Sequence, residues 1–168
     1  QIAKEYTEKV YSYEWNKDFA AARNYGLDRA TGRWFMFLDA DEQLVACDEL
    51  ISFLNTKSEW ENYFTAEIVI RNFVNIEENK YSDFTSARIF RLDTGNRFSG
   101  SIHEVPNRIS PIKNLLQSRL DHFGYVYKSE EAKQKKFQRN NELLEIELEK
   151  SPDDVRLLCL YSVSCPDE

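Results

Sequence analysis

The sequence predicts an α/β domain that is followed by a pair of α-helices. Residues 34–38 are five consecutive apolar residues after a predicted helix and Gly32, a pattern typical of a strand buried on both faces of a parallel sheet. Residues 64–73 and 86–91 are rich in the β-branched and aromatic side chains that favour further strands. From residue 130 onward, apolar side chains are spaced among many charges, which indicates an amphipathic helix.

The first part of the chain contains one well-marked helix signal. Asp18 is a good N-cap for a helix over residues 19–30, because its carboxylate can accept a hydrogen bond from a free backbone N–H. The Thr-Gly pair that follows would stop this helix. Residues 2–9 are expected to end an earlier helix, and residues 10–13 to form a short strand.

Turn signals divide the remainder of the α/β part. We expect a short helix over residues 48–54. The Gly-Asn pair at residues 95–96 predicts a turn that precedes an extended run toward Ile102.

We place a domain boundary near residue 128. Residues 1–128 are predicted to form the mixed α/β domain, and residues 129–168 a helical hairpin. The first helix of this hairpin covers residues 130–150, and a Ser-Pro-Asp-Asp stretch separates it from a second helix over residues 155–163.

Composition excludes several classes of protein. A chain of 168 residues with 42% hydrophobic residues is long enough to bury one core. The formal net charge of −7 argues against nucleic-acid binding, which needs basic stripes that neutralise phosphates. No apolar run approaches the roughly 20 residues that a membrane-spanning helix needs. We therefore expect no nucleic-acid partner and no transmembrane segment.

The cysteines Cys47, Cys159 and Cys165 predict free thiols. Their number is odd, and none of them belongs to a C-x-x-C pair. With only two histidines in the chain, a zinc site is also disfavoured. This use of cysteine indicates a reducing compartment, and we expect the protein to be cytoplasmic.

An acidic segment, Asp39-Ala40-Asp41-Glu42, directly follows the predicted strand at residues 34–38. Ligands bind open α/β sheets beyond the carboxyl ends of the strands, where carboxylates at positions i and i+2 can face one site. Such oxygen ligands suit Mg²⁺ or Mn²⁺, which keep positions open for substrate phosphates. The segment therefore indicates a metal–phosphate site, although acidic residues at strand ends also occur as ordinary loop residues or helix N-caps.

Three blocks of sequence together resemble family 2 glycosyltransferases, whose fold is called GT-A. Residues 15–24, W-N-K-D-F-A-A-A-R-N, are similar to the W-x-x-D-F-x-x-A-R-N stretch of a bacterial subgroup. Residues 37–42, F-L-D-A-D-E, resemble the D-x-D motif of the family. The third block joins R-I-F-R at residues 88–91 with F-S-G-S-I-H-E at residues 98–104. In this subgroup a tetratricopeptide-like helical region often follows, which fits the predicted helical hairpin.

The resemblance implies catalytic and metal-binding roles. Asp41 would ligate Mn²⁺ or Mg²⁺, and Asp39 would contact the metal or the ribose of the donor. The metal would neutralise charge on the departing nucleoside diphosphate. Inverting displacement needs a general base, and Glu104 is the candidate. His103 would ligate the metal or hold the diphosphate, with a structural, hydrogen-bonded histidine as the alternative.

Arg23, Asn24 and Arg88, together with Asp39, are expected to bind the donor. The fork of donors on an arginine suits phosphate, although Arg23 can equally form a salt bridge to the acidic segment. Arg88 and Arg91 are three residues apart on a predicted strand and point to opposite faces, so at most one of them faces the site.

Three features are given a structural interpretation first. Glu42 is expected to cap the next helix, with a supporting role at the metal as the alternative. His122 is expected to be a hydrogen-bonded structural histidine, although the stretch H-F-G-Y at residues 122–125 also resembles the bacterial subgroup. The basic run at residues 133–136, with Arg139, is expected to be a solvated helix face, with an acidic partner as the alternative.

The predicted function is metal-dependent, inverting transfer of a sugar from a UDP- or GDP-sugar to a glycan, lipid-linked or peptide acceptor. One alternative is a phosphatase of the haloacid dehalogenase type, which also places D-x-D after an apolar strand. Another is a non-catalytic helical-repeat module on a degenerate transferase. In the family, βα units of the nucleotide pocket would precede Gln1, so we expect this chain to carry the metal and acceptor side of the site.

Overall fold

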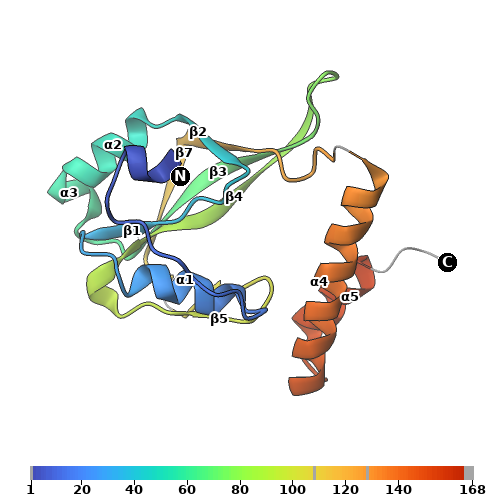
Figure 1. Ribbon diagram of the computed structural model, residues 1–168. Helices are drawn as coiled ribbons and strands as arrows, with labels where there is room; N and C mark the ends of the chain where they lie inside the picture. The colour runs from blue at the N-terminus through green and yellow to red at the C-terminus, as the bar shows by residue number, and fades with distance from the viewer. Residues whose placement is uncertain (1, 108, 128, 165–168) are drawn as a thin grey trace.

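A twisted mixed sheet with helices on both faces, followed by a pair of C-terminal helices, makes up the computed structural model of the chain (Figure 1). The structure describes residues 2–107, 109–127 and 129–164. This arrangement confirms the predicted fold class, a partial GT-A sheet with a helical hairpin after it.

The main sheet contains five strands in the order β1-β4-β3-β7-β2. β3 and β7 pair in parallel, and the other neighbours are antiparallel. A separate antiparallel pair joins β5 to β6. The bounds of the strands are β1 Trp34–Met36, β2 Glu42–Ala46, β3 Thr65–Asn75, β4 Lys80–Arg91, β5 Phe98–Ser99, β6 Val105–Pro106 and β7 Ile112–His122.

The acidic segment crosses one end of this sheet. β1 and β2 follow each other in the chain but form its two opposite edges, so residues 37–41 connect one edge to the other. The N–H of Phe37 donates to the carbonyl of Arg88 at 3.3 Å, and the N–H of Phe123 donates to the carbonyl of Asp41 at 2.9 Å. The backbone of the segment is therefore held both to β4 and to the residue that follows β7.

Side chains cap the first turns of the helices α1 and α4. The carboxylate of Asp18 accepts from the N–H of Ala21 at 2.8 Å, and the hydroxyl of Ser129 accepts from the N–H of Ala132 at 3.2 Å. The helices are η1 Ile2–Glu5, α1 Phe19–Leu27, α2 Asp48–Asn55, α3 Lys57–Trp60, η2 Leu92–Thr94, α4 Glu130–Lys150 and α5 Val155–Ser164. The predicted helices at 19–30, 48–54, 130–150 and 155–163 are thus confirmed, with α1 ending at Leu27.

Apolar side chains are buried on both faces of the sheet. Ile89 and Phe90, neighbours on β4, are 0% and 1% exposed, and because they point to opposite faces both faces must be covered. Ile89 belongs to the core under α2 and α3, which includes Phe53. Phe90 belongs to the core under α1, with Phe98 of β5.

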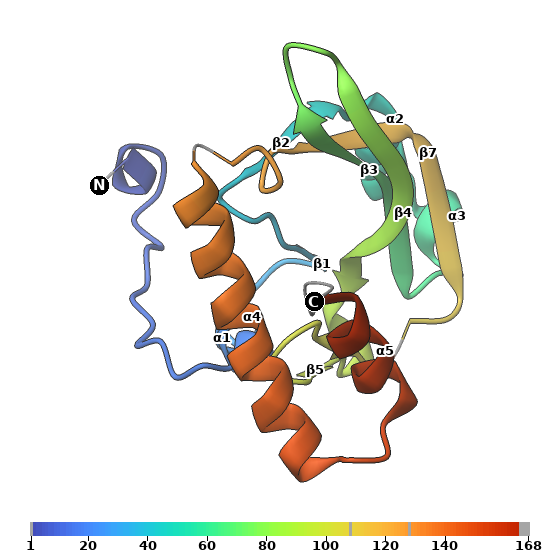
Figure 2. The same ribbon diagram turned by 90° about the vertical axis from the view of Figure 1, so that its right-hand side faces the viewer.

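The C-terminal helices pack against each other and against the loop before β6. α4 and α5 run antiparallel beside the sheet domain (Figure 2). Ile102 is buried with Leu144 of α4 and Leu157 of α5, and Phe19 of α1 packs against this cluster. The contact places α4 opposite the acidic segment. The domain boundary near residue 128 stays a prediction.

Two predictions for the N-terminal region were wrong. Residues 10–13 form no strand, because no strand in the described part of the chain lies beside them, and Tyr11 is 54% exposed. Of residues 2–9, only Ile2–Glu5 are helical, as a single 3-10 turn.

The strand expected at residues 34–38 differs in length and pairing. Its regular part is β1, which covers Trp34–Met36 at the sheet edge and pairs antiparallel with β4 rather than within a parallel sheet. Leu38 lies beyond the strand and is 49% exposed. β2 and β7 were not predicted, because Glu42, Lys113 and other charged residues interrupt the apolar pattern in both.

None of the helices described here is long and apolar enough to span a membrane. Cys47 and Cys159 are free thiols, as predicted, whereas Cys165 lies outside the described residues.

Asp18→Ala should lower the free energy of unfolding by about 1 kcal/mol, because the first turn of α1 loses its cap. Asp18→Asn should stay close to wild type, since the amide oxygen still accepts the hydrogen bond. Urea denaturation of the three proteins measures both effects. Equal stability of Asp18→Ala and wild type would show that α1 does not depend on this cap.

Candidate functional site

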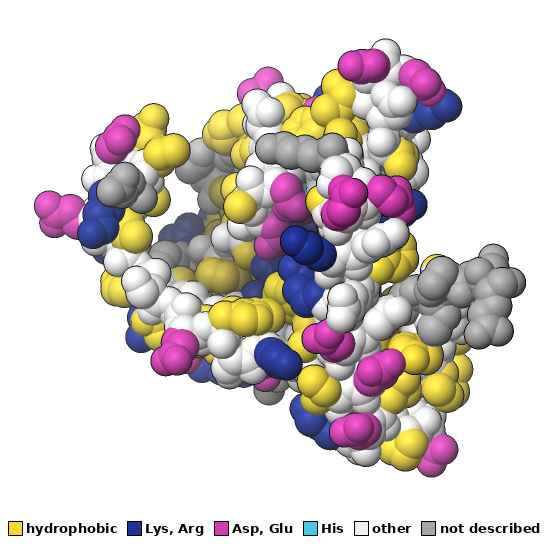
Figure 3. All heavy atoms as spheres, turned by 45° about the vertical axis from the view of Figure 1, so that its right-hand side comes forward, with side chains coloured by type: hydrophobic (Ala, Val, Ile, Leu, Met, Phe, Trp, Pro, Cys, Tyr) yellow, Lys and Arg dark blue, Asp and Glu magenta, His cyan; other side chains and the backbone are white. Residues whose placement is uncertain are grey.

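A cavity of about 630 Å³ lies between the acidic segment and helix α4. Five of the predicted site residues line it, namely Arg23, Asp39, Asp41, His103 and Glu104. The lining also includes His122 and three residues of α4, which are Lys136, Arg139 and Asn140. Acidic and basic side chains lie next to one another near the centre of the face shown in Figure 3. The fold therefore gathers opposite charges around one hollow.

Arg23 joins two of the acidic residues. Its Nε contacts the carboxylate of Glu104, and its Nη1 and Nη2 lie 3.3 and 3.4 Å from the carboxylate oxygens of Asp39. The guanidinium also lies 3.8 Å from the ring centre of Phe37, an arrangement that favours a cation. The salt bridge to the acidic segment, one of the two interpretations of Arg23, is thus present.

Glu42 forms a buried ion pair with Arg88. The carboxylate oxygen Oε1 lies 2.6 Å from Nη2 of Arg88, and the two side chains are 1% and 11% exposed. The other oxygen of Glu42 accepts from the N–H of Asp39 at 2.9 Å, while Asp39 itself lies 3.8 Å from Arg88. Burial lowers the pKa of the Arg88 guanidinium, and the carboxylates of Glu42 and Asp39 raise it.

The prediction that Glu42 caps the next helix was wrong. Glu42 is the first residue of β2, and its carboxylate is used by Arg88 and by the backbone of Asp39. The prediction that Arg88 and Arg91 face opposite sides is confirmed. Arg91 pairs with Asp93 and lies over the ring of Trp60, whereas Arg88 lies over the ring of Phe37.

Asp41 faces a different partner from Asp39. Its Oδ2 lies 3.5 Å from Nε2 of His122, and Nδ1 of that ring lies 2.6 Å from Oδ1 of Asn72 on β3. When Nδ1 donates to Asn72, Nε2 carries a lone pair directed to the cavity side. A Cβ at Gly124 would lie 2.5 Å from both Oδ2 of Asp41 and Nε2 of His122, so only glycine fits there.

His122 lines the cavity, although the sequence analysis did not assign it to the site. Sequence alone favoured a structural histidine, and the hydrogen bond to Asn72 is indeed of that kind. The other nitrogen of the ring nevertheless faces the cavity beside Asp41. A sequence signal was available, because the His-Phe-Gly-Tyr stretch at residues 122–125 fitted the family pattern.

His103 and Asn24 occupy contrasting positions. His103 lines the cavity in the left-handed backbone region, with a φ of 50°, and burial lowers the pKa of its imidazole. The side-chain amide of Asn24 pairs with the backbone N–H and carbonyl of Phe98, at 3.0 and 2.9 Å. Of the predicted donor-binding residues, Asn24 and Arg88 do not line the cavity; Arg88 still lies 3.8 Å from Asp39, whereas Asn24 is turned to Phe98.

Helix α4 contributes basic side chains to one side of the cavity. Nζ of Lys136 donates to the carbonyl of Gly124 at 2.9 Å. Burial lowers the pKa of the Lys136 ammonium, and the carboxylates of Asp41 and Asp39 raise it. Lys136 and Asn140 are four residues apart and therefore share one helix face, so part of the basic run expected to be solvated borders the cavity instead.

The residues around Asp41 suit a hard divalent cation that keeps positions for a substrate. Among residues 2–107, 109–127 and 129–164, no three His, Cys, Asp or Glu side chains are close enough to form a complete metal cluster. Asp39 faces two arginines, and His103 is not grouped with the two aspartates. Asp41 and His122 supply one carboxylate and one imidazole; the carboxylate suits Mg²⁺ or Mn²⁺, which take further ligands from water and substrate phosphates, and the imidazole is the softer of the two ligands.

Comparisons with known proteins agree with the resemblance seen in the sequence motifs. The profile of the family described as "Glycosyl transferase family 2" matches residues 1–113. The SPbeta prophage-derived glycosyltransferase SunS of Bacillus subtilis (strain 168) is 29% identical over 167 residues, which are 95% of this chain and 38% of that protein. The glycosyltransferase SunS of Bacillus phage SPbeta shows the same values.

A TPR repeat-containing protein of Synechococcus elongatus is 36% identical over 106 residues, which are 62% of this chain and 25% of that protein. The chain spans 38% of the length of the two SunS proteins.

Glu42→Gln should lower the free energy of unfolding by about 3 kcal/mol, because Arg88 keeps its buried charge and loses its principal partner. Asp93→Asn is the matched control. This variant removes Asp93 as the partner of Arg91. Because the Asp93 side chain is 62% exposed, the free energy of unfolding should fall by less than about 1 kcal/mol. Chemical denaturation compares the two. Equal losses would contradict a special role for the buried pair.

Proposed function

We propose that this chain, which belongs to glycosyl transferase family 2, carries the metal and acceptor side of an enzyme that moves a sugar from a nucleotide-diphosphate donor to an acceptor. Membership of the family supports sugar transfer, and the names of the SunS relatives agree with it. The observation that carries the proposal is the cavity in which Asp41 and His122 face the basic residues of α4.

Mn²⁺ or Mg²⁺ would be held by Asp41 together with His122. Gly124 supports this assignment, because it leaves just enough room for both side chains to meet. A bound metal offsets the negative charge of a nucleoside diphosphate as it departs. Asp39 and His103, the other predicted ligands, are assigned to the donor: Asp39 to the ribose and His103 to the diphosphate. Asp39 is suited to this role because Arg23 and Arg88 hold its carboxylate in place.

The diphosphate of a UDP- or GDP-sugar would lie between the acidic segment and α4. Arg23, Lys136 and Arg139 border this space and provide positive charge on two sides. Arginine binds phosphate through paired N–H groups, and lysine binds it as a point charge. Arg88 would act indirectly, since its guanidinium is already engaged with Glu42.

Glu104 would accept the proton of the acceptor in an inverting displacement. Its carboxylate lines the cavity and is held by Arg23. Arg23 contacts both Glu104 and Asp39, so donor binding beside Asp39 would be coupled to the position of Glu104. The acceptor would be a glycan, a lipid-linked group or a peptide. The free thiols Cys47 and Cys159 support a cytoplasmic location.

Calorimetry with UDP- and GDP-sugars, with and without Mn²⁺, tests the proposal. We expect nucleotide binding that depends on the metal and that is weakened at least about tenfold by Asp41→Ala, since a metal ligand is lost. Asp93→Ala, which changes an exposed carboxylate outside the cavity, should bind like wild type. The proposal fails if nucleotides do not bind in a metal-dependent way, or if Asp41→Ala leaves their binding unchanged.

A further inference from the structure

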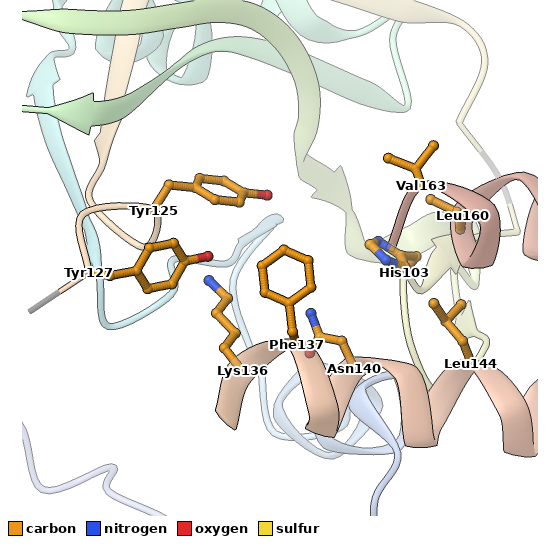
Figure 4. A pocket seen from close by; sticks show the side chains of 9 residues that line it. All are labelled: His103, Tyr125, Tyr127, Lys136, Phe137, Asn140, Leu144, Leu160 and Val163. Carbon is orange, nitrogen blue, oxygen red and sulfur yellow. The ribbon is translucent and has the colours of Figure 1, made fainter. Parts of the chain in front are cut away.

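A second pocket of about 280 Å³ opens beside the charged cavity, and Figure 4 shows the side chains around it. Tyr125 and Tyr127 come from the segment after β7, Phe137 comes from α4, and Leu160 and Val163 come from α5. Most of these side chains are apolar. The pocket thus lies where the sheet domain meets both C-terminal helices.

The pocket has a polar end and an apolar end. In Figure 4 the hydroxyls of Tyr125 and Tyr127 and the ammonium of Lys136 lie at one end. Nζ of Lys136 is 4.9 and 5.9 Å from the centres of the two tyrosine rings. Leu160 and Val163 lie at the other end, with His103 beside them, and the ring of Phe137 stands between the two groups in the figure.

The pocket is continuous with the proposed reaction site. His103, Lys136 and Asn140 line both hollows. The ring of Tyr125 also packs edge-on against His122, with ring centres 5.4 Å apart. A molecule in the pocket would therefore lie next to His122 and to the loop that carries the candidate base.

Apolar surface is left exposed around this pocket. Phe137 is 39% exposed and Val163 is 85% exposed, whereas Leu144 at the α4 side is 1% exposed. Covering exposed apolar side chains with an apolar group is favourable. A polyhydroxylated ring would place hydroxyls against Leu144, Leu160 and Val163, which cannot hydrogen-bond with them, and away from the tyrosines and Lys136 only His103 and Asn140 offer polar atoms.

We propose that this pocket is the acceptor subsite and that it takes an apolar, ring-sized group joined to a hydrogen-bond-accepting oxygen. The inference rests on the proposed function and names the chemical class of its acceptor. The apolar group packs on Phe137 and the side chains of α5. The oxygen accepts from Lys136 or from the hydroxyls of Tyr125 and Tyr127.

The position fits a single displacement. The acceptor nucleophile forms a bond to the anomeric carbon of the donor sugar, and the bond from that carbon to the diphosphate oxygen breaks. The proton of the nucleophile passes to Glu104, and the electron pair of the broken bond leaves with the diphosphate. An acceptor anchored in the pocket presents its nucleophile from the side of His103, which borders both hollows.

A pair of ring carboxylates tests the inference on the intact chain. Cyclohexanecarboxylate and glucuronate both carry a carboxylate on a six-membered ring, and only glucuronate carries ring hydroxyls and a ring oxygen. We expect cyclohexanecarboxylate to bind with a dissociation constant on the order of millimolar, and glucuronate to bind clearly more weakly. Saturation-transfer and chemical-shift NMR measure both.

Two variants locate the binding. Phe137→Ala should weaken cyclohexanecarboxylate by roughly threefold or more, because the ring contact is lost. Val163→Asp should weaken it further, because it puts a negative charge at the apolar end. Val163 is exposed, so this variant does not depend on core packing. Phe84→Ala, an exposed aromatic residue on β4 outside the pocket, is the matched control.

The inference is overturned if glucuronate binds as tightly as cyclohexanecarboxylate, or if Val163→Asp leaves cyclohexanecarboxylate binding unchanged. The outcome is separate from that of the proposed function. Metal-dependent nucleotide binding without cyclohexanecarboxylate binding would refute the acceptor class alone. Loss of metal-dependent nucleotide binding would refute the proposed function itself.

Discussion

The buried pairing of Arg88 with Glu42 is the interaction on which the geometry of the site depends. Arg88 lies on β4, and Glu42 begins β2 at the far edge of the sheet, so their contact joins the two ends of the crossing acidic segment. A buried ion pair stabilises a fold only when its remaining hydrogen-bonding groups are satisfied. Here the second oxygen of Glu42 accepts from the backbone N–H of Asp39, so the pair also fixes the backbone of the segment, whereas the buried Nε of Arg88 has no hydrogen-bond partner among the described residues.

This constraint gives the two aspartates different surroundings. Asp39 is turned to Arg23 and Arg88, whereas Asp41 is turned to His122. The acidic segment is therefore more than a cluster of equivalent carboxylates. Both carboxylates are about equally exposed, at 45% and 46%, but Asp39 is paired with two arginines, whereas Asp41 lies beside a histidine at the edge of the cavity that α4 borders.

Local sequence signals predicted the elements whose formation depends on their own residues. The cap at Asp18, the amphipathic pattern of α4 and the alternation of Arg88 and Arg91 all appear in the structure. β7 was not predicted, because it forms a strand by pairing with β3, which is distant in the sequence. The same pairing brings Asn72 opposite His122, so no local pattern could place that histidine beside Asp41.

The central claim is that Asp41 and His122 together form the metal–diphosphate centre. Paramagnetic NMR with Mn²⁺ and UDP tests it most directly, because broadening falls off steeply with distance from the metal. We predict that the His122 ring signals broaden first at substoichiometric Mn²⁺, and that Asp41→Ala abolishes this selectivity. Uniform broadening across the surface, or selective broadening at the distant β3–β4 turn instead, would contradict the account.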